Sequence, residues 1–180
     1  MFQTEIILCL QSFANDELTT IINLITTLGD DKILAAILIV VAFGVNLQKG
    51  IILMQIFQWT HIFTSGLKYC FSMPRPTYVH GEIQNLQHGE FDVTPYTHLG
   101  AKNFFGSLDS EILTTFRNLK SEDYGFPSGH TSQAAVLWGG IAMLFRKRFL
   151  YWGAAIIAVL VAFSRMYLGR HFLGDVLGGL

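Results

Sequence analysis

Apolar residues in this chain are gathered into blocks that are separated by short polar connections. Four blocks are candidate helices of a membrane bundle, and each is shorter than the about 20 residues of a lone span; they cover residues 33–47, 51–67, 131–145 and 149–163. A fifth block begins at Phe172 and stops at Leu180. It is too short to cross a bilayer, so we expect either that the native chain continues or that this helix ends inside the membrane.

The remaining segments are more polar. Residues 1–31 contain two pieces with helical apolar spacing, which we expect to be short helices at the membrane interface, with Gly29 ending the second. Residues 73–126 form a polar loop outside the membrane, in which 109–120 is a candidate amphipathic helix. The pattern therefore predicts an all-α membrane helical bundle of about five to six helices, folded as one domain over residues 1–180, with the long loop between the second and third clear spans.

The composition supports a membrane protein. Hydrophobic residues make up 51% of the chain and charged residues 14%, whereas a soluble domain has about a quarter charged residues. The net charge of −1 and the lack of a basic face argue against nucleic acid as a partner. The two cysteines make no disulfide framework, and the N-terminus lacks the pattern of a removable signal peptide.

The basic residues indicate how the helices are threaded. Lys49 and the run at 146–148 occupy two short connections, and such connections lie on the cytoplasmic side. Following the spans from there brings four polar groups to the opposite end of the bundle. These groups are Lys68 with Arg75, the PSGH sequence at 127–130, Arg165, and His171 with Asp175. Inverting the protein would move the cluster to the other face without dispersing it.

The basic residues of this cluster, together with the start of the PSGH helix, could bind an anion. Arg75 and Arg165 offer planar donor groups that match phosphate oxygens, and Lys68 adds a point charge. Ser128 and Gly129 precede a predicted helix, where a hydroxyl, backbone N–H groups and the positive helix end face outward. The sequence therefore predicts a phosphate-binding basin.

Two histidines add possible catalysis. His171 and Asp175 are four residues apart, so on a helix beginning near Gly169 they would share a face, and the carboxylate would fix the imidazole tautomer. The other ring nitrogen of His171 is then free to attack phosphorus, while His130 serves as general acid and base. This chemistry requires no metal and no cofactor. A tripeptide, HGE, occurs at 80–82 and 88–90, but we interpret it as solvated loop rather than as a metal site.

Three motifs now stand in order: K-x6-R-P from Lys68, PSGH at 127–130, and S-R-x5-H-x3-D from Ser164 to Asp175. Together they resemble the signature of the type 2 phosphatidic acid phosphatase superfamily, the lipid phosphate phosphatases. The resemblance covers roughly residues 67–180. It implies that His171 is the phosphorylated nucleophile and that Asp175 orients it. It also implies that His130 is the acid and base, and that the phosphate is held by Lys68, Arg75, Ser128, Gly129 and Arg165.

The leading hypothesis is thus an integral membrane phosphatase, in a bacterial inner membrane with its site on the outer, periplasmic side. Its partners would be the bilayer and a lipid phosphate or pyrophosphate of the phosphatidic acid, phosphatidylglycerol phosphate or undecaprenyl pyrophosphate type. Two alternatives stay open: an enzyme like the vanadium-dependent haloperoxidases, whose vanadate mimics the phosphoryl transition state, and a non-enzymatic carrier that binds anions. The oligomeric state is left open.

Overall fold

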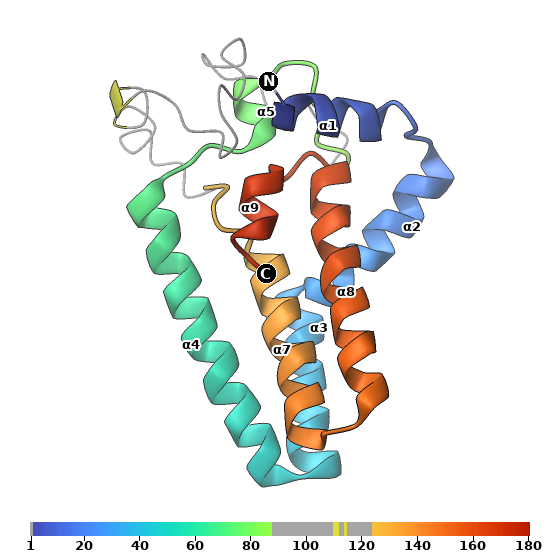
Figure 1. Ribbon diagram of the computed structural model, residues 1–180, viewed down its shortest axis with the longest axis vertical. Helices are drawn as coiled ribbons and strands as arrows, with labels where there is room; N and C mark the ends of the chain where they lie inside the picture. The colour runs from blue at the N-terminus through green and yellow to red at the C-terminus, as the bar shows by residue number, and fades with distance from the viewer. Residues whose placement is uncertain (1, 88–109, 112–113, 115–123) are drawn as a thin grey trace.

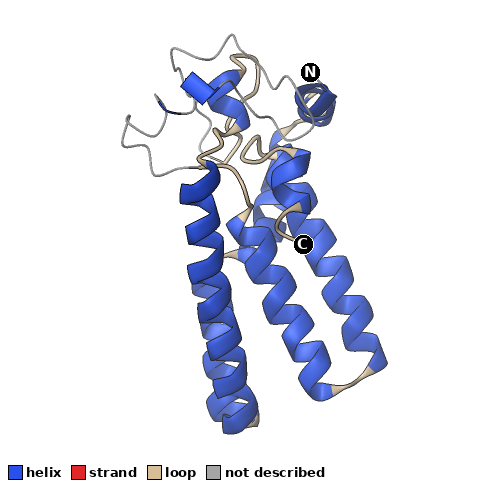
Figure 2. Ribbon diagram, turned by 60° about the vertical axis from the view of Figure 1, so that its left-hand side comes forward, coloured by secondary structure: helices blue, strands red, loops and turns tan. Residues whose placement is uncertain are grey.

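The computed structural model describes residues 2–87, 110, 111, 114 and 124–180. Its regular elements over these residues are all helical, as predicted (Figures 1 and 2). The N-terminal part contains α1 (Phe2–Gln11), α2 (Asp16–Thr26), the 3-10 turn η1 (Thr27–Gly29), α3 (Asp31–Ile39) and the π-helical η2 (Val40–Val45). The later elements are α4 (Leu47–Phe71), α5 (Pro76–Val79), α7 (Gly129–Phe145), α8 (Arg148–Tyr167) and α9 (Leu173–Leu177).

The four long segments α3–η2, α4, α7 and α8 run alongside one another, as the predicted threading requires (Figure 1). The turn before α4 and the turn between α7 and α8 lie at one end of the bundle. Asn46 begins α4 by accepting a hydrogen bond from the backbone N–H of Lys49 at 2.9 Å, and Arg146 ends α7 in the left-handed conformation. The other end of the bundle carries α1, α5 and α9.

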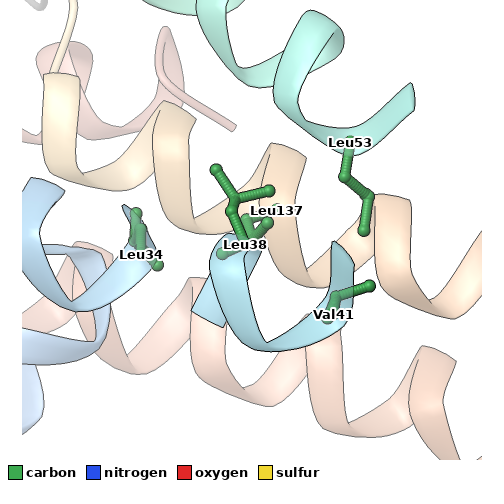
Figure 3. Close-up of a cluster of buried hydrophobic side chains, with 5 residues drawn as sticks. All are labelled: Leu34, Leu38, Val41, Leu53 and Leu137. Carbon is green, nitrogen blue, oxygen red and sulfur yellow. The ribbon is translucent and has the colours of Figure 1, made fainter. Parts of the chain in front are cut away.

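Leucine and valine side chains fill the space between three of these helices. Leu34, Leu38 and Val41 come from α3 and η2, Leu53 from α4 and Leu137 from α7 (Figure 3). All five are at most 8% exposed. Such close packing holds helices together in a bilayer, where lipid is as apolar as the side chains and the hydrophobic effect contributes little.

Many large apolar side chains are exposed on the outer faces of the helices, whereas some polar side chains are buried between them. Phe43, Trp59 and Trp152 are between 67% and 78% exposed. By contrast, Thr64 of α4 is buried with its hydroxyl oxygen 3.3 Å from that of Ser132 of α7. In a water-soluble protein the surface is more polar than the interior, and the reverse distribution seen here suits a hydrocarbon environment. Within the described part of the chain, α8 is the one helix long and apolar enough to span a membrane by itself.

Several predicted limits of the spans needed correction. α7 begins at Gly129 rather than at 131, and α8 covers Arg148–Tyr167 rather than 149–163. α4 extends beyond the predicted 51–67 to Leu47–Phe71, because Asn46 caps its start and the helix ends only at Ser72, which is in the left-handed conformation. Within the helix, His61 Nδ1 lies 2.9 Å from Gln133 Nε2 of α7. The last predicted helix begins at Leu173 and comprises five residues. The candidate helix at 109–120 and the second HGE sequence fall almost entirely outside the described residues.

The N-terminal helices form as expected, but Gly29 has a different role from the one predicted. Asn15 begins α2 by accepting a hydrogen bond from the Leu18 N–H at 2.8 Å. α2 ends at Thr26 and continues into η1, so Gly29 does not terminate it. A Cβ at Gly29 would lie 2.8 Å from the backbone oxygen of His130. The glycine is therefore required by close packing against α7 rather than by helix termination.

A second close approach yields a stability prediction. A Cβ on Gly50 of α4 would lie 2.3 Å from the Cα of Ala42, so Gly50→Ala must displace η2 from α4. We expect it to lower stability by about 1–3 kcal/mol, the usual cost of overpacking, and to lower the melting temperature in detergent. Gly66→Ala on the same helix is the matched control, since a Cβ there meets nothing within 4 Å. Equal melting temperatures for the two variants would contradict this packing.

Candidate active site

The structure brings the predicted site residues to one end of the bundle, where α4, α7, α8 and α9 meet (Figure 1). Lys68 lies in the last turn of α4 and Arg75 directly precedes α5. Ser128 precedes α7, whose first two residues are Gly129 and His130. The remaining members come from the C-terminal segment: Arg165 from the last turn of α8, His171 from the bend that follows, and Asp175 from α9.

The bend after α8 is folded back onto that helix. Gly169 adopts a positive φ of 72°, a conformation that favours glycine. The backbone N–H groups of Arg170 and His171 then both donate to the carbonyl oxygen of Arg165, at 3.0 and 3.3 Å. As a result the His171 side chain is 2% exposed and sits beside the end of α8.

His171 and Asp175 form a buried pair. The Nδ1 atom of His171 lies 3.5 Å from Oδ2 of Asp175, a carboxylate that is also fixed by the backbone N–H of Phe172 at 2.9 Å. Because α9 begins at Leu173, the predicted helix from Gly169 is wrong, and the turn before α9 makes the pairing instead of a shared helical face. With Nδ1 directed at the carboxylate, Nε2 is the nitrogen left for chemistry.

The surroundings of His171 favour a neutral imidazole. Burial lowers the pKa of His171 well below its ordinary value, and the positive charges of Arg75, Arg165 and Lys68 lower that pKa further. A neutral ring keeps the lone pair that a nucleophile needs. A positive charge on the His130 ring would lower the pKa of His171 further, so the two rings lie close enough to influence one another.

The three cations are oriented by neutral oxygen atoms. Lys68 Nζ donates to the carbonyl of Tyr124 at 2.5 Å. The Arg75 guanidinium lies 3.5 Å from the carbonyl oxygen of Arg170. Arg165, 3% exposed, donates to the Thr26 hydroxyl and to the Gln87 side-chain oxygen, both at 3.2 Å. These acceptors are uncharged, so they orient the cations and add no negative charge of their own.

Ser128 connects two parts of the site. Its backbone N–H donates to the carbonyl oxygen of Asp175 at 2.9 Å, which joins the start of α7 to α9. Its hydroxyl accepts a hydrogen bond from Thr131 at 3.0 Å and therefore has its own proton left to donate. Gly179 packs on this segment, where a Cβ would meet the Ser128 carbonyl oxygen at 2.7 Å.

The site contains polar contacts that sequence reasoning missed. Gln3 of α1 and Thr26 of α2 reach α9 and Arg165, and Gln87 reaches Arg165 from the loop after α5. None belongs to a recognisable motif, and the one available signal was a polar residue within an apolar helical face. Over the described residues, no group of three or more histidine, cysteine, aspartate or glutamate side chains is arranged to hold a metal ion.

Comparisons with known proteins give one family model and several lipid phosphatases as similar to this chain. The model of the PAP2 superfamily matches residues 34–180. Undecaprenyl-diphosphatase BcrC of Bacillus subtilis (strain 168) is 47% identical over 58 residues, which are 32% of this chain and 29% of that protein. Phosphatidylglycerophosphatase B of the same strain is 45% identical over 65 residues, covering 31% of this chain and 32% of that protein. The matched segments thus span less than a third of these curated relatives.

The fold has a solved counterpart. The crystal structure of a transmembrane PAP2 type phosphatidylglycerolphosphate phosphatase from Bacillus subtilis superposes with a TM-score of 0.70 at 24% sequence identity. The match covers 98% of this chain and 76% of that one. The helical arrangement described above is therefore that of a known membrane fold.

Proposed function

Because the chain belongs to the PAP2 superfamily, we propose that it is an integral membrane phosphatase that hydrolyses the phosphomonoester or pyrophosphate of a lipid. The observation that carries this proposal is the buried His171–Asp175 pair, surrounded by the charges of Lys68, Arg75 and Arg165. A neutral nucleophile among cations is suited to an anionic, electrophilic phosphorus.

The first step transfers the phosphoryl group to the protein. Nε2 of His171 attacks phosphorus and forms a P–N bond while the P–O bond to the lipid breaks. His130 donates its proton to the departing lipid oxygen. Asp175 holds Nδ1–H of His171 and stabilises the positive ring that develops. Lys68, Arg75 and Arg165, together with Ser128 and Gly129, bind the phosphate oxygens and stabilise the charge of the pentacoordinate transition state.

The second step releases phosphate. His130, now deprotonated, accepts a proton from water, and the resulting oxygen nucleophile attacks phosphorus. The P–N bond breaks, inorganic phosphate leaves, and both histidines return to their starting protonation states. In this scheme the cations and the imidazoles do the chemistry without a metal.

The membrane arrangement follows from the loop charges. Lys49 and the basic run at 146–148 lie at the end opposite the site, and basic connections stay in the cytoplasm. We therefore place the site on the outer side, the periplasmic side of a bacterial inner membrane. Relatives named for undecaprenyl diphosphate and phosphatidylglycerophosphate support these two lipids as the substrates to examine first. Phosphatidic acid is the third, because the sequence motifs resemble those of phosphatidic acid phosphatases.

A phosphate-release assay tests this function. The purified protein in detergent should release phosphate from at least one of undecaprenyl diphosphate, phosphatidylglycerophosphate and phosphatidic acid, at a rate that excess EDTA leaves unchanged. No release from any of them would contradict the proposal and would favour a carrier that only binds anions. Release that EDTA abolishes would contradict the metal-independent mechanism. Vanadate-dependent halide oxidation, measured on the same preparation, would support the haloperoxidase-like alternative.

A further inference from the structure

The N-terminal helices contact the candidate active site, although they precede the part of the chain that the superfamily model matches. That match begins at residue 34, whereas α1, α2 and η1 occupy residues 2–29. Figure 1 shows α1 lying across the end of the bundle that holds the site, with α2 descending beside α8. Three contacts from this segment reach Arg165, His130 and Gly174, the residue directly before Asp175.

The first contact fixes the helix that carries Asp175. The side chain of Gln3 is fully buried, and its Oε1 accepts a hydrogen bond from the backbone N–H of Gly174 at 2.7 Å. Gly174 lies in the first turn of α9 and directly precedes Asp175. A helix of five residues is too short to be stable by itself, so its position depends on contacts of this kind.

The second contact orients a phosphate-binding cation. Thr26, 5% exposed, accepts a hydrogen bond from the Arg165 guanidinium at 3.2 Å, and Gln87 accepts another at the same distance. Two acceptors fix the plane of the guanidinium and thereby the direction of its remaining donors.

The third contact sets the distance between the N-terminal segment and His130. A Cβ at Gly29 would meet the His130 carbonyl oxygen at 2.8 Å and a methyl group of Val161 at 2.8 Å. η1 therefore lies directly against the start of α7. The N-terminal segment therefore packs against the end of the bundle that holds the site at three points: Gln3, Thr26 and Gly29.

We propose that Gln3 and Thr26, both from the N-terminal segment, are positioning residues of the active site that act through Asp175 and Arg165. This inference rests on the proposed phosphatase function. The two residues should affect different kinetic parameters. Gln3 supports the pair that drives the chemical step, whereas Thr26 supports a cation that binds the phosphate in the ground state as well.

Two pairs of variants test this with the purified full chain and its best lipid phosphate substrate. Gln3→Met keeps the side-chain length and removes the acceptor, and it should lower kcat about 10- to 100-fold at a little-changed KM, as small misplacements of reacting groups do. Gln3→Glu retains an acceptor oxygen, and burial favours the protonated, uncharged form of its carboxyl group, so it should restore kcat to within about threefold of the wild type. Thr26→Val should raise KM about three- to tenfold, the effect of one lost hydrogen bond, and Thr26→Ser should restore it.

The controls separate positioning from a loss of folded protein. Gln48→Met lies in an exposed first turn of α4 at the far end of the bundle, and Thr20→Val removes an exposed hydroxyl of α2 that donates to Asp16 O. Both should behave as wild type. Melting temperatures in detergent are recorded for every variant.

Each outcome decides the inference. The kcat effect at Gln3, the KM effect at Thr26 and rescue by Glu and Ser would support it. It is overturned if Gln3→Met and Thr26→Val match wild type, or if all four variants lose activity in proportion to their melting temperatures without rescue. An inactive wild type would remove the proposed function and this inference together, whereas an active wild type with unaffected variants removes this inference alone.

Discussion

Replacing His171 by alanine is expected to lower kcat for phosphate release by at least about 10³-fold, since removal of a catalytic nucleophile typically costs this much or more. The reason is chemical. Without the imidazole no P–N bond forms, and the cationic basin alone must promote direct attack by water. Asp175 would remain, but its carboxylate has no ring to orient.

Two measurements check this result. Phosphate release gives kcat, and brief incubation with 32P-labelled lipid followed by alkaline quenching traps the acid-labile phosphohistidine, which should be present in wild type and missing in His171→Ala. His61→Asn is the matched control, because His61 pairs with Gln133 between α4 and α7 and should leave kcat nearly unchanged. Label retained on the His171→Ala protein, or more than about a tenth of wild-type kcat, would rule out this nucleophile.

Topology was predictable from local signals. Spacing of apolar blocks and the positions of Lys49 and the basic run at 146–148 fixed which helix ends meet, and the structure places those ends together. Both signals act residue by residue: burial in lipid requires apolar side chains, and loop charge sets orientation. The co-location of His130 and His171 follows from these signals without any knowledge of side-chain packing.

Local geometry within the site was less predictable. His171 and Asp175 were expected to share a helical face, yet α9 begins two residues after His171 and the pair forms across a turn. A spacing of four residues suits both arrangements. The choice between them depends on Gly169 and on the Arg165 carbonyl, which accepts two backbone N–H groups and holds the bend against α8. Gly169 indicates a turn, but the backbone contacts that hold the bend leave no trace in the pattern of residue types.

Contacts from the N-terminal segment were the least predictable. Gln3 and Thr26 are each one of several polar residues in their helices, and such residues usually face water. They are buried here because α1 and α2 dock on the site, which is a tertiary event. Gly29 was misinterpreted for the same reason: glycine after a helix commonly ends it, whereas here the close approach of the His130 backbone requires the missing side chain.

The role of His130 predicts a dependence on the leaving group. A lipid alkoxide is a poor leaving group, so its departure requires a proton from His130, and His130→Asn should lower release from a lipid phosphomonoester about 10²- to 10⁴-fold, the range for general acid–base catalysis. Nitrophenolate leaves without protonation. With an aryl phosphate carrying that group, the first step should be much less impaired, although the second step still lacks its base.

The variant should therefore show a rapid burst of nitrophenolate followed by slow turnover, with phosphohistidine accumulating on His171. Stopped-flow absorbance measures the burst, and the ratio of the losses for the two substrates measures the missing acid. Lys68→Met is the matched control, because Lys68 is assigned to the phosphate oxygens rather than to the leaving oxygen and should slow both substrates by a similar factor. An equal loss for both substrates in His130→Asn, with no burst, would show that His130 transfers no proton to the leaving oxygen.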